Sequence, residues 1–186
     1  MIRLCSSSIT RAKLLDSFNL EYIQSPIDFN EESINQTNAK SFVYNVVLGK
    51  FNSALNSYNL DIPILVADTV ISTNRGEMLR KAKNIDEARD ILLKQSGAKI
   101  SIITATILKS LELEFVDISA TWFTFSKFDK DDLNSYLSSL EWQGKAGACM
   151  VEGFCKKYIK KVDGLESNAM GLPVEKILPW IKGLND

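Results

Sequence analysis

The sequence predicts a single α/β domain over residues 1–186, and three observations support this prediction. Apolar runs rich in β-branched residues alternate along the chain with segments of helical periodicity. With 186 residues, the chain is long enough for one buried core but too short for two large domains. No repeat, linker or low-complexity tract interrupts it, so the strands and helices belong to one unit.

Five helices are predicted from apolar residues that recur every three or four positions and from capping residues at the segment ends. They cover residues 10–18, 39–55, 84–97 and 129–140, with a last helix that begins near 172–173. In the fourth helix we expect Leu140 to lie on the buried face, and in the last helix we expect the same of Leu178.

Five strands are predicted from apolar, β-branched and aromatic runs, at residues 2–5, 62–72, 99–108, 114–125 and about 158–162. The second run is apolar on both alternating faces, which is typical of a central strand covered on both sides. Only Asp68 and Thr69 interrupt this run, so these two residues need a separate explanation.

Charge and composition exclude several classes of protein. With 22 basic and 23 acidic residues, the chain lacks the broad positive field of sequence-independent nucleic-acid binding, so no nucleic-acid partner is expected. The absence of histidine excludes Ser-His-Asp and Cys-His catalysis and histidine-rich zinc sites. The chemistry must come from other side chains or from a hard metal ion.

The cysteines and the hydropathy pattern favour a cytoplasmic protein. The three cysteines, at positions 5, 149 and 155, form no Cys-x-x-Cys pair and are odd in number, which favours a reducing compartment. Without a histidine to activate them, Cys149 and Cys155 are expected to be buried or incidental thiols. No run approaches the roughly 20 apolar residues of a membrane span, and the N-terminus lacks signal-peptide features, so no membrane partner is expected.

Asp68 is the most informative residue. Burying a carboxylate in an apolar strand costs on the order of several kcal/mol unless a partner or a metal offsets the lost hydration. Asp68 has either a catalytic role or a position at the strand end, where it caps a turn. Lys50 follows Ala39 by eleven residues, close to three helical turns, so it shares the apolar helix face. Its ammonium group either reaches water from the helix end or points into a cleft to pair with Asp68 or with phosphate.

Three further polar segments suit a polyphosphate or a metal ion, and each also has a simpler explanation. The turn from Ser6 to Arg11 offers hydroxyls, amides and a guanidinium to a phosphate group, although serines before a helix are usually caps. The basic cluster around Lys81 suits either a polyphosphate or solvent. Glu31 and Glu32 are either a solvated pair or part of an oxygen-ligand site for Mg²⁺ or Mn²⁺.

The order and spacing of these residues resemble the Maf (septum-formation-like) nucleoside triphosphate pyrophosphatase family. The resemblance extends from Leu4 to about Leu178, which is nearly the full chain. The matching motifs are Ser6-x-Ser8-x-x-Arg11-x-x-Leu14-Leu15, Asp28 with Glu31, Phe42-Val43 up to Lys50, Ala67-Asp68-Thr69-Val70, Lys81, Ser96-Gly97, Thr104, Lys145-Ala146-Gly147 with Glu152-Gly153, and Ser167-Asn168-x-x-Gly171-Leu172-Pro173.

The resemblance implies a twisted mixed β-sheet with flanking helices, split by a deep cleft between two lobes. It also implies cleavage of the α–β phosphoanhydride of nucleoside triphosphates to a monophosphate and pyrophosphate, with Mg²⁺, Mn²⁺ or Co²⁺ as cofactor. By position, Asp68 corresponds to the proton acceptor that activates water and, together with Glu31, to the metal site. The implied substrate-binding residues are Ser8, Arg11, Lys50, Lys81 and Glu152, of which the last lies near the base.

This chemistry agrees with the composition of the chain. Lysine, arginine and a hard cation supply the positioning and charge neutralisation that phosphoryl transfer needs, without histidine. A carboxylate base beside such cations is expected to stay ionised at neutral pH. The departures from the commonest family pattern are Ile9 and Thr10 in place of Pro-Arg, Arg80 and Ala82 in place of Gly and Pro around Lys81, and Ile100 in place of His.

The preferred substrate stays open between two branches of the family. Cys149 and Glu152 replace the Tyr and Gln of the dTTP/UTP-directed branch, and the run 152–154 is similar to the branch that prefers 7-methyl-GTP. Thr69, however, follows the dTTP/UTP branch. The inosine/xanthosine triphosphate pyrophosphatase type and a non-catalytic, nucleotide-binding regulator of cell division are the alternatives. The expected partners are the nucleotide and, as an option, a second copy in a homodimer.

Overall fold

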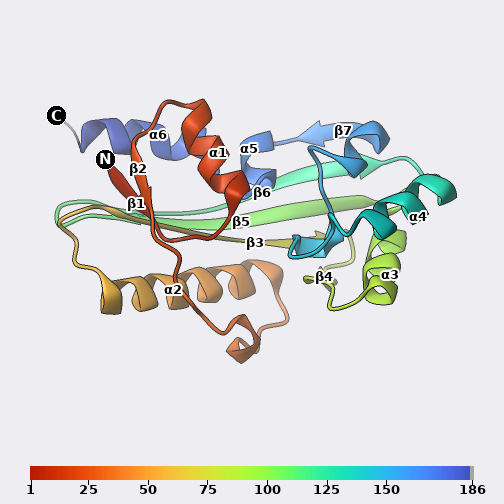
Figure 1. Ribbon diagram of the computed structural model, residues 1–186, viewed down its shortest axis with the longest axis horizontal. Coiled ribbons are helices and arrows are strands. Elements are labelled where there is room, and N and C mark those ends of the chain that lie inside the picture. The colour runs from red at the N-terminus through yellow and green to blue at the C-terminus, as the bar shows by residue number, and fades with distance from the viewer. Residues whose placement is uncertain (185–186) are drawn as a thin grey trace.

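The computed structural model describes residues 1–184 as a seven-stranded mixed sheet with helices on both faces (Figure 1). The strands are β1 (Ile2–Leu4), β2 (Tyr22–Gln24), β3 (Ile64–Thr73), β4 (Met78–Leu79), β5 (Lys99–Lys109), β6 (Glu114–Phe125) and β7 (Ile159–Asp163). Their order is β2-β1-β3-β5-β6-β7, and β4 pairs with β3 off this path. This confirms the predicted α/β class with a mixed sheet and flanking helices. The last two residues of the predicted range 1–186 lie outside the described residues.

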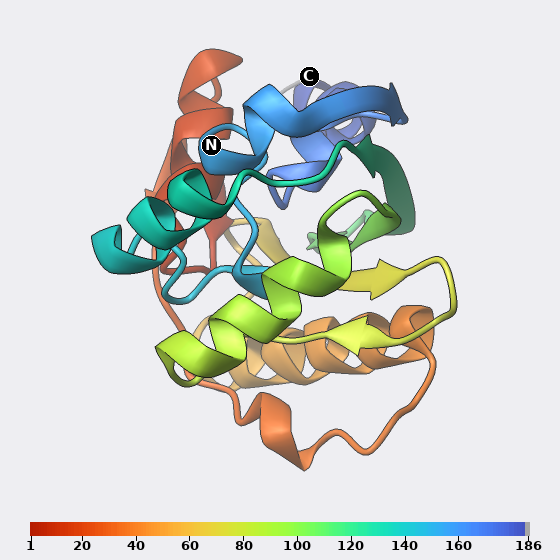
Figure 2. The same cartoon turned by 90° about the vertical axis from the view of Figure 1, so that its right-hand side faces the viewer.

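Helices cover both faces of the sheet and one of its ends. They are α1 (Ile9–Ser17), α2 (Ala39–Ser57), α3 (Ile85–Gln95), α4 (Lys130–Ser139), α5 (Glu166–Ala169) and α6 (Val174–Gly183), with 3₁₀ helices at Glu31–Ser33, Ala146–Ala148 and Phe154–Tyr158. α2 lies along one face, and α1 and α6 lie along the other (Figure 1). α3 and α4 cover the end of the sheet remote from the N-terminus (Figure 2). None of these helices is long and apolar enough to cross a membrane.

β3 is an interior strand, as its apolar sequence predicts. It runs parallel to β1 and antiparallel to β5, so neighbours flank it on both edges. Its side chains alternate between the two faces. Val66 and Val70 pack into the apolar cluster beneath α2, whereas Leu65 and Ala67 pack into the cluster beneath α1 and α6. The strand is therefore covered on both faces, and every residue from Ile64 to Asp68 is buried.

The helix predictions are correct in position but wrong for two side chains. Leu140 follows the end of α4 in a left-handed conformation, with φ of 62°, and is 49% exposed. The chain leaves the helix at this residue, so Leu140 cannot extend the buried face of α4. In α6 the buried stripe consists of Val174, Ile177 and Ile181, whereas Leu178 is only half-buried because it lies one helical step off that stripe.

Thr106 offers a test of the packing within β5. Its side chain is 0% exposed, and its hydroxyl has no hydrogen-bond partner among residues 1–184. Valine keeps the branched shape and removes the unpaired polar atom. We expect Thr106→Val to raise the free energy of unfolding by about 1 kcal/mol, measured by urea denaturation. A loss of stability would show that the hydroxyl has a partner, such as a buried water molecule.

Candidate active site

A cavity of about 500 Å³ opens at an edge of β3 where the sheet is interrupted. On this edge β1 pairs with β3 only as far as Leu65, and β4 pairs with β3 at Ile71 and Ser72. Between these points the described strands leave residues 66–70 without a neighbour on this edge. The interruption lets side chains from both faces of β3 reach the same space.

Asp68 and Thr69 occupy this interruption and point to opposite faces of β3. Asp68 alternates with Val66 and Val70 on the α2 side and is 4% exposed. Thr69 lies on the other side, toward α1. Both residues line the cavity. The two residues that interrupt the apolar run in the sequence are therefore the polar residues that β3 contributes to the cavity, one from each of its faces.

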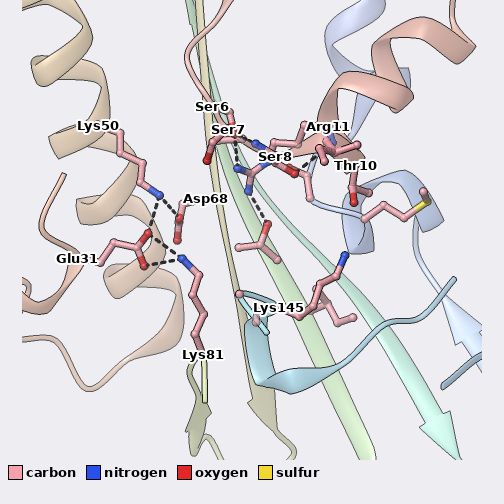
Figure 3. Close-up of a pocket in the computed structure, with 18 of the residues that line it drawn as sticks. Ser6, Ser7, Ser8, Thr10, Arg11, Glu31, Lys50, Asp68, Lys81 and Lys145 are labelled. Carbon is pink, nitrogen blue, oxygen red and sulfur yellow. Dashed lines mark hydrogen bonds and ion pairs between the residues drawn. The ribbon is translucent and has the colours of Figure 1, made fainter. Parts of the chain in front are cut away.

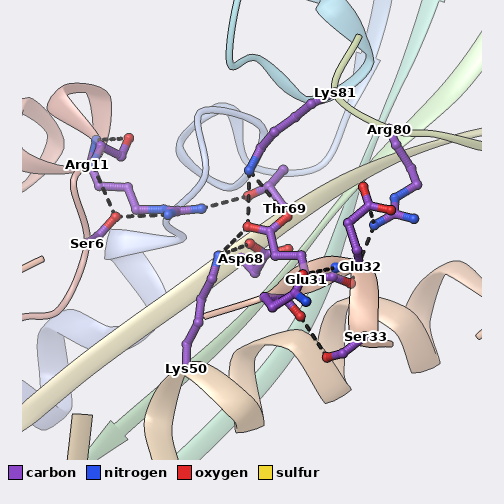
Figure 4. Close-up of polar contacts among 12 residues, drawn as sticks. Ser6, Arg11, Glu31, Glu32, Ser33, Lys50, Asp68, Thr69, Arg80 and Lys81 are labelled. Carbon is purple, nitrogen blue, oxygen red and sulfur yellow. Dashed lines mark hydrogen bonds and ion pairs between the residues drawn. The ribbon is translucent and has the colours of Figure 1, made fainter. Parts of the chain in front are cut away.

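Lys50 reaches Asp68 from α2, about three helical turns along from Ala39. Its Nζ lies 2.5 Å from Asp68 Oδ1 and 2.8 Å from Glu31 Oε1 (Figure 4). The Lys50 side chain is 15% exposed and that of Asp68 is 6% exposed, so this ion pair is largely removed from solvent. Of the alternatives left open for Lys50, the structure shows the pairing with Asp68 and excludes the one in which the ammonium group reaches water from the helix end.

The two adjacent glutamates have different surroundings. Glu31 begins a 3₁₀ helix and turns inward, where Lys81 Nζ lies 3.1 Å from Oε1 and 3.3 Å from Oε2 (Figure 4). Glu32 is 66% exposed and lies 3.7 Å from an Arg80 nitrogen at the surface. The prediction of a solvated glutamate is therefore correct for Glu32, whereas Glu31 belongs to the cavity.

Burial and charge act in opposite directions on the two inner carboxyls. Burial raises the pKa of Asp68, and the attraction of Lys50 offsets this only in part, while Glu31 adds to the rise. Burial also raises the pKa of Glu31, but Lys50 and Lys81 outweigh it and leave this pKa below its usual value. The sequence predicts both a cost of burial for Asp68 and neighbouring cations that keep its carboxylate ionised. The structure shows that Asp68 is the more deeply buried of the two carboxyls, and its raised pKa makes it a better base than an ordinary aspartate.

Arg11 enters the cavity from the first turn of α1 and is held on three sides. Its Nε donates to the Gly171 carbonyl at 2.8 Å, Nη1 donates to Ser6 Oγ at 3.1 Å, and Nη2 donates to Thr69 Oγ1 at 3.3 Å. Ser8 caps α1, and its Oγ accepts from the Arg11 backbone N–H at 3.3 Å. The cap explanation for Ser8 is therefore correct, and the same residue also lines the cavity (Figure 3).

Gly171 allows the close approach of Arg11 to the C-terminal part of the chain. Its φ of +101° lies in a region that side chains rarely adopt, and an added Cβ would lie 3.2 Å from Arg11 Nε. Any other residue at this position would strain the backbone and crowd the guanidinium. The glycine in the Ser-Asn-x-x-Gly motif therefore has a structural reason.

Glu152 and Lys145 line the cavity and form an ion pair there. Lys145 Nζ lies 3.9 Å from Glu152 Oε1, and both side chains are about one third exposed. Figure 3 shows Lys145 pointing into the same space as Arg11 and Lys81. Cys149 lines the cavity beside them, and its thiol lies 3.1 Å from that of Cys155. Both cysteines are free and buried, as predicted.

The charges that line the cavity cancel. The cationic side chains are Arg11, Lys50, Lys81 and Lys145, and the acidic side chains are Asp28, Glu31, Asp68 and Glu152. The four cations are distributed around the space rather than gathered at one point (Figure 3). The cavity can thus contact an anion at several positions without carrying a net positive charge of its own.

The structure brings together every residue that the sequence analysis assigned to a site, namely Ser8, Arg11, Glu31, Lys50, Asp68, Lys81 and Glu152. It adds Ser6 and Thr69, which the sequence singled out without a site role of their own, and Lys145, whose only signal was its place in the quoted motifs. Two departures from the family pattern, Ile9 and Thr10, also line the cavity. Ile100 instead lies in the apolar core beside α3, where histidine would be hard to accommodate.

Comparisons with known proteins agree with this arrangement. A family model described as Maf-like protein matches residues 1–184. A protein of a Nitratiruptor species, named nucleoside triphosphate pyrophosphatase, is 53% identical over 99% of this chain and 100% of its own length. A protein of Helicobacter pylori (strain Shi470) with the same name is 37% identical over 95% of this chain and 93% of its own length.

A third relative carries a more specific name. The dTTP/UTP pyrophosphatase of Acholeplasma laidlawii (strain PG-8A) is 32% identical over 100% of this chain and 97% of its own length. Matches of this extent leave no long segment of the chain outside the similarity. Because the family model covers nearly the whole sequence and three relatives exceed 30% identity over it, this chain belongs to the Maf family.

Proposed function

We propose that this protein hydrolyses nucleoside triphosphates to a nucleoside monophosphate and pyrophosphate. The observation that supports this most directly is the buried Asp68 carboxylate, paired with Lys50 at the open edge of β3. Arg11 and Lys81 present cationic groups to the same cavity. The names of the relatives support the same activity.

Asp68 is the proton acceptor in this proposal. A water molecule attacks the α-phosphorus, the bond from that phosphorus to the bridging oxygen breaks, and pyrophosphate leaves with the bond electrons. The proton lost by the water passes to the Asp68 carboxylate, whose raised pKa makes it a better base than an ordinary aspartate. Lys50 holds this carboxylate in place through its contact with Oδ1.

The cationic side chains bind the triphosphate. Arg11 is fixed by three hydrogen bonds and offers its remaining donors to phosphate oxygens. Lys81 is 49% exposed and contacts only Glu31 among the described residues, so it can turn toward an incoming phosphate. Ser8 contributes at the start of α1, where unpaired backbone amides favour an anion.

A divalent cation fits the donor set of the cavity. The lining carries four positive and four negative side chains, so it cannot by itself neutralise a triphosphate. Asp68 and Glu31 supply hard carboxylate oxygens of the kind that Mg²⁺ and Mn²⁺ prefer. No cluster of three or more acidic or cysteine ligands occurs in residues 1–184, which fits a cation completed by substrate oxygens and water. Mg²⁺, Mn²⁺ or Co²⁺, when bound, would neutralise charge on the triphosphate.

The proposed activity is tested by measuring pyrophosphate release from a panel of standard, methylated and deaminated nucleoside triphosphates. Each substrate is assayed with Mg²⁺, Mn²⁺, Co²⁺ or EDTA. We expect release with a divalent cation and loss of release with EDTA. A preference for deaminated purines would indicate the inosine/xanthosine triphosphate type. Tight nucleotide binding without turnover of any substrate would contradict the proposal and favour a regulatory protein.

We further propose that Glu152 directs the site toward 7-methyl-GTP. A carboxylate accepts hydrogen bonds from the N–H groups of guanine, and methylation at N7 leaves the ring cationic, which a nearby carboxylate favours. Glu152 lines the cavity and is 32% exposed, and within residues 1–184 its one ion pair is with Lys145, at 3.9 Å, so its oxygens are accessible to a base.

Glu152→Gln is expected to lower kcat/KM for 7-methyl-GTP at least tenfold, since a charged hydrogen bond of about 1.5–3 kcal/mol is lost. The same variant should leave kcat/KM for UTP nearly unchanged. Steady-state assays with both substrates measure kcat/KM. The control is Glu141→Gln, because Glu141 is an exposed glutamate outside the cavity. Equal losses for the two substrates would show that Glu152 does not select the base.

A further inference from the structure

The Arg11 guanidinium has two donors left for a ligand. Arginine carries five N–H donors in a planar fork. Three of them donate to the Gly171 carbonyl, Ser6 Oγ and Thr69 Oγ1. The other two, one on each terminal nitrogen, have no protein acceptor within residues 1–184. One donor on each terminal nitrogen suits two phosphate oxygens, provided that the plane of the guanidinium is held in one orientation.

Thr69 and Thr104 form a directed chain of hydrogen bonds behind Arg11. The two threonines face each other in the register of β3 and β5, and their hydroxyls lie 3.0 Å apart. Thr104 Oγ1 donates its single proton to the Asn168 carbonyl at 2.7 Å. Thr104 must therefore accept from Thr69, because a hydroxyl has only one proton to donate. Because the Thr69 hydroxyl donates its proton to Thr104, its oxygen is oriented to accept the hydrogen bond from Arg11 Nη2.

Thr104 lies behind the cavity rather than in it. Its side chain is 0% exposed, and it is absent from the residues that line the cavity, whereas Thr69 is present. Its backbone acceptor, Asn168, is also 0% exposed. A buried hydroxyl without a partner is costly, so the Thr104 hydroxyl, which pairs with both Thr69 and the Asn168 backbone carbonyl, has a single low-energy arrangement.

We propose that Thr104 is a positioning residue for substrate binding, because it fixes the direction of the Thr69 hydroxyl and thereby the orientation of Arg11. This inference rests on the proposed function, in which Arg11 binds the triphosphate. A correctly oriented Arg11 stabilises the bound substrate and the transition state equally. Loss of that orientation therefore raises KM more than it lowers kcat.

The test compares Thr104→Val with Thr104→Ser and with Thr106→Val. Thr104→Val should raise KM about tenfold, which is the size expected for one lost hydrogen bond. Its kcat should stay within about twofold of the wild-type value. Thr104→Ser keeps the hydroxyl and should restore KM. Thr106 lies two residues along β5 on the same face, is equally buried and has no hydrogen-bond partner within the described chain, so Thr106→Val should leave KM unchanged.

A double-mutant cycle separates positioning from a general effect on the fold. In an Arg11→Ala background, Thr104→Val should cause no further change in KM, because the residue through which it acts is gone. The positioning role of Thr104 is overturned if Thr104→Val leaves KM unchanged. It is also overturned if Thr104→Val still raises KM in the Arg11→Ala background. Should Thr104→Val fail to fold, Thr69→Val in the same cycle carries the test.

A binding measurement distinguishes failure of this inference from failure of the proposed function. Calorimetric titration with inorganic tripolyphosphate reports on Arg11 without turnover. We expect Thr104→Val to weaken this binding about tenfold relative to Thr106→Val. If the wild-type chain releases no pyrophosphate but the titration shows this difference, only the proposed function fails. If pyrophosphate is released but binding by Thr104→Val and Thr106→Val is equal, only the positioning role fails.

Discussion

Asp68→Asn is expected to lower kcat for pyrophosphate release about a thousandfold, within the range typical of a lost general base. The amide has nearly the same size as the carboxylate but does not accept the proton of the attacking water. KM should change little, because Arg11 and Lys81 still bind the triphosphate. Steady-state pyrophosphate assays at saturating cation measure both parameters. A variant with unimpaired kcat would remove Asp68 from the mechanism.

The same variant is expected to stay folded, for a reason that follows from the direction of the Asp68 pKa. Because burial raises this pKa above its unfolded value, the protonated form favours folding. That contribution is fully present below the unfolded pKa and is lost as the pH rises through the folded pKa. Asparagine is neutral at every pH. The melting temperature of Asp68→Asn should therefore be higher than that of the wild type at pH 8, and the two should become equal in acid. A melting temperature far below that of the wild type at pH 8 would contradict this.

Lys50→Met is expected to destabilise the protein by about 3 kcal/mol at neutral pH, as is typical when one partner of a buried ion pair is removed. Methionine fills the space of the lysine stem but leaves Asp68 and Glu31 facing each other without the cation between them. The pKa of Asp68 and the pKa of Glu31 should both rise as a result. Urea denaturation at pH 8 and pH 5 measures the effect, which should be smaller at pH 5 because protonation relieves the repulsion.

Lys81→Met provides the matched control for this stability measurement. Lys81 also pairs with Glu31, but its side chain is 49% exposed against 15% for Lys50. Exposed ion pairs contribute about 1 kcal/mol or less, so Lys81→Met should change the unfolding free energy little. Equal losses in the two variants would show that burial of the Lys50 pair does not determine its contribution.

Much of the fold and the centre of the site could be predicted because local patterns encode them. The doubly apolar run of β3 marks an interior strand, and within it Asp68 stands out as a buried charge. Lys50 shares a face with Ala39 through helical periodicity alone. The pairing of Lys50 with Asp68 then follows from the packing of α2 against β3. The positions of Asp68 and Lys50 follow from the spacing of residues along one element, whereas their pairing needs the contact between two elements.

The features that could not be predicted depend on contacts between distant parts of the chain. The cavity exists because β1 pairs with β3 only as far as Leu65, and the two-residue strand β4 pairs with β3 only from Ile71 on. No local pattern in the sequence records that interruption. Thr104 and Asn168 belong to matching motifs, but they lie 64 residues apart, and no local pattern predicts the hydrogen bond between them. The upward shift in the pKa of Asp68 likewise depends on how much protein surrounds it.

In the proposed function, the interruption in the sheet places the α-phosphorus of a nucleotide beside Asp68. A crystal structure of the protein with an α,β-methylene nucleoside triphosphate and Mg²⁺ tests this most directly. We expect the triphosphate to lie between Arg11 and Lys81, with the α-phosphorus facing the Asp68 carboxylate and room for one water molecule between them. Phosphates bound outside the cavity, or a γ-phosphorus facing Asp68, would contradict the account.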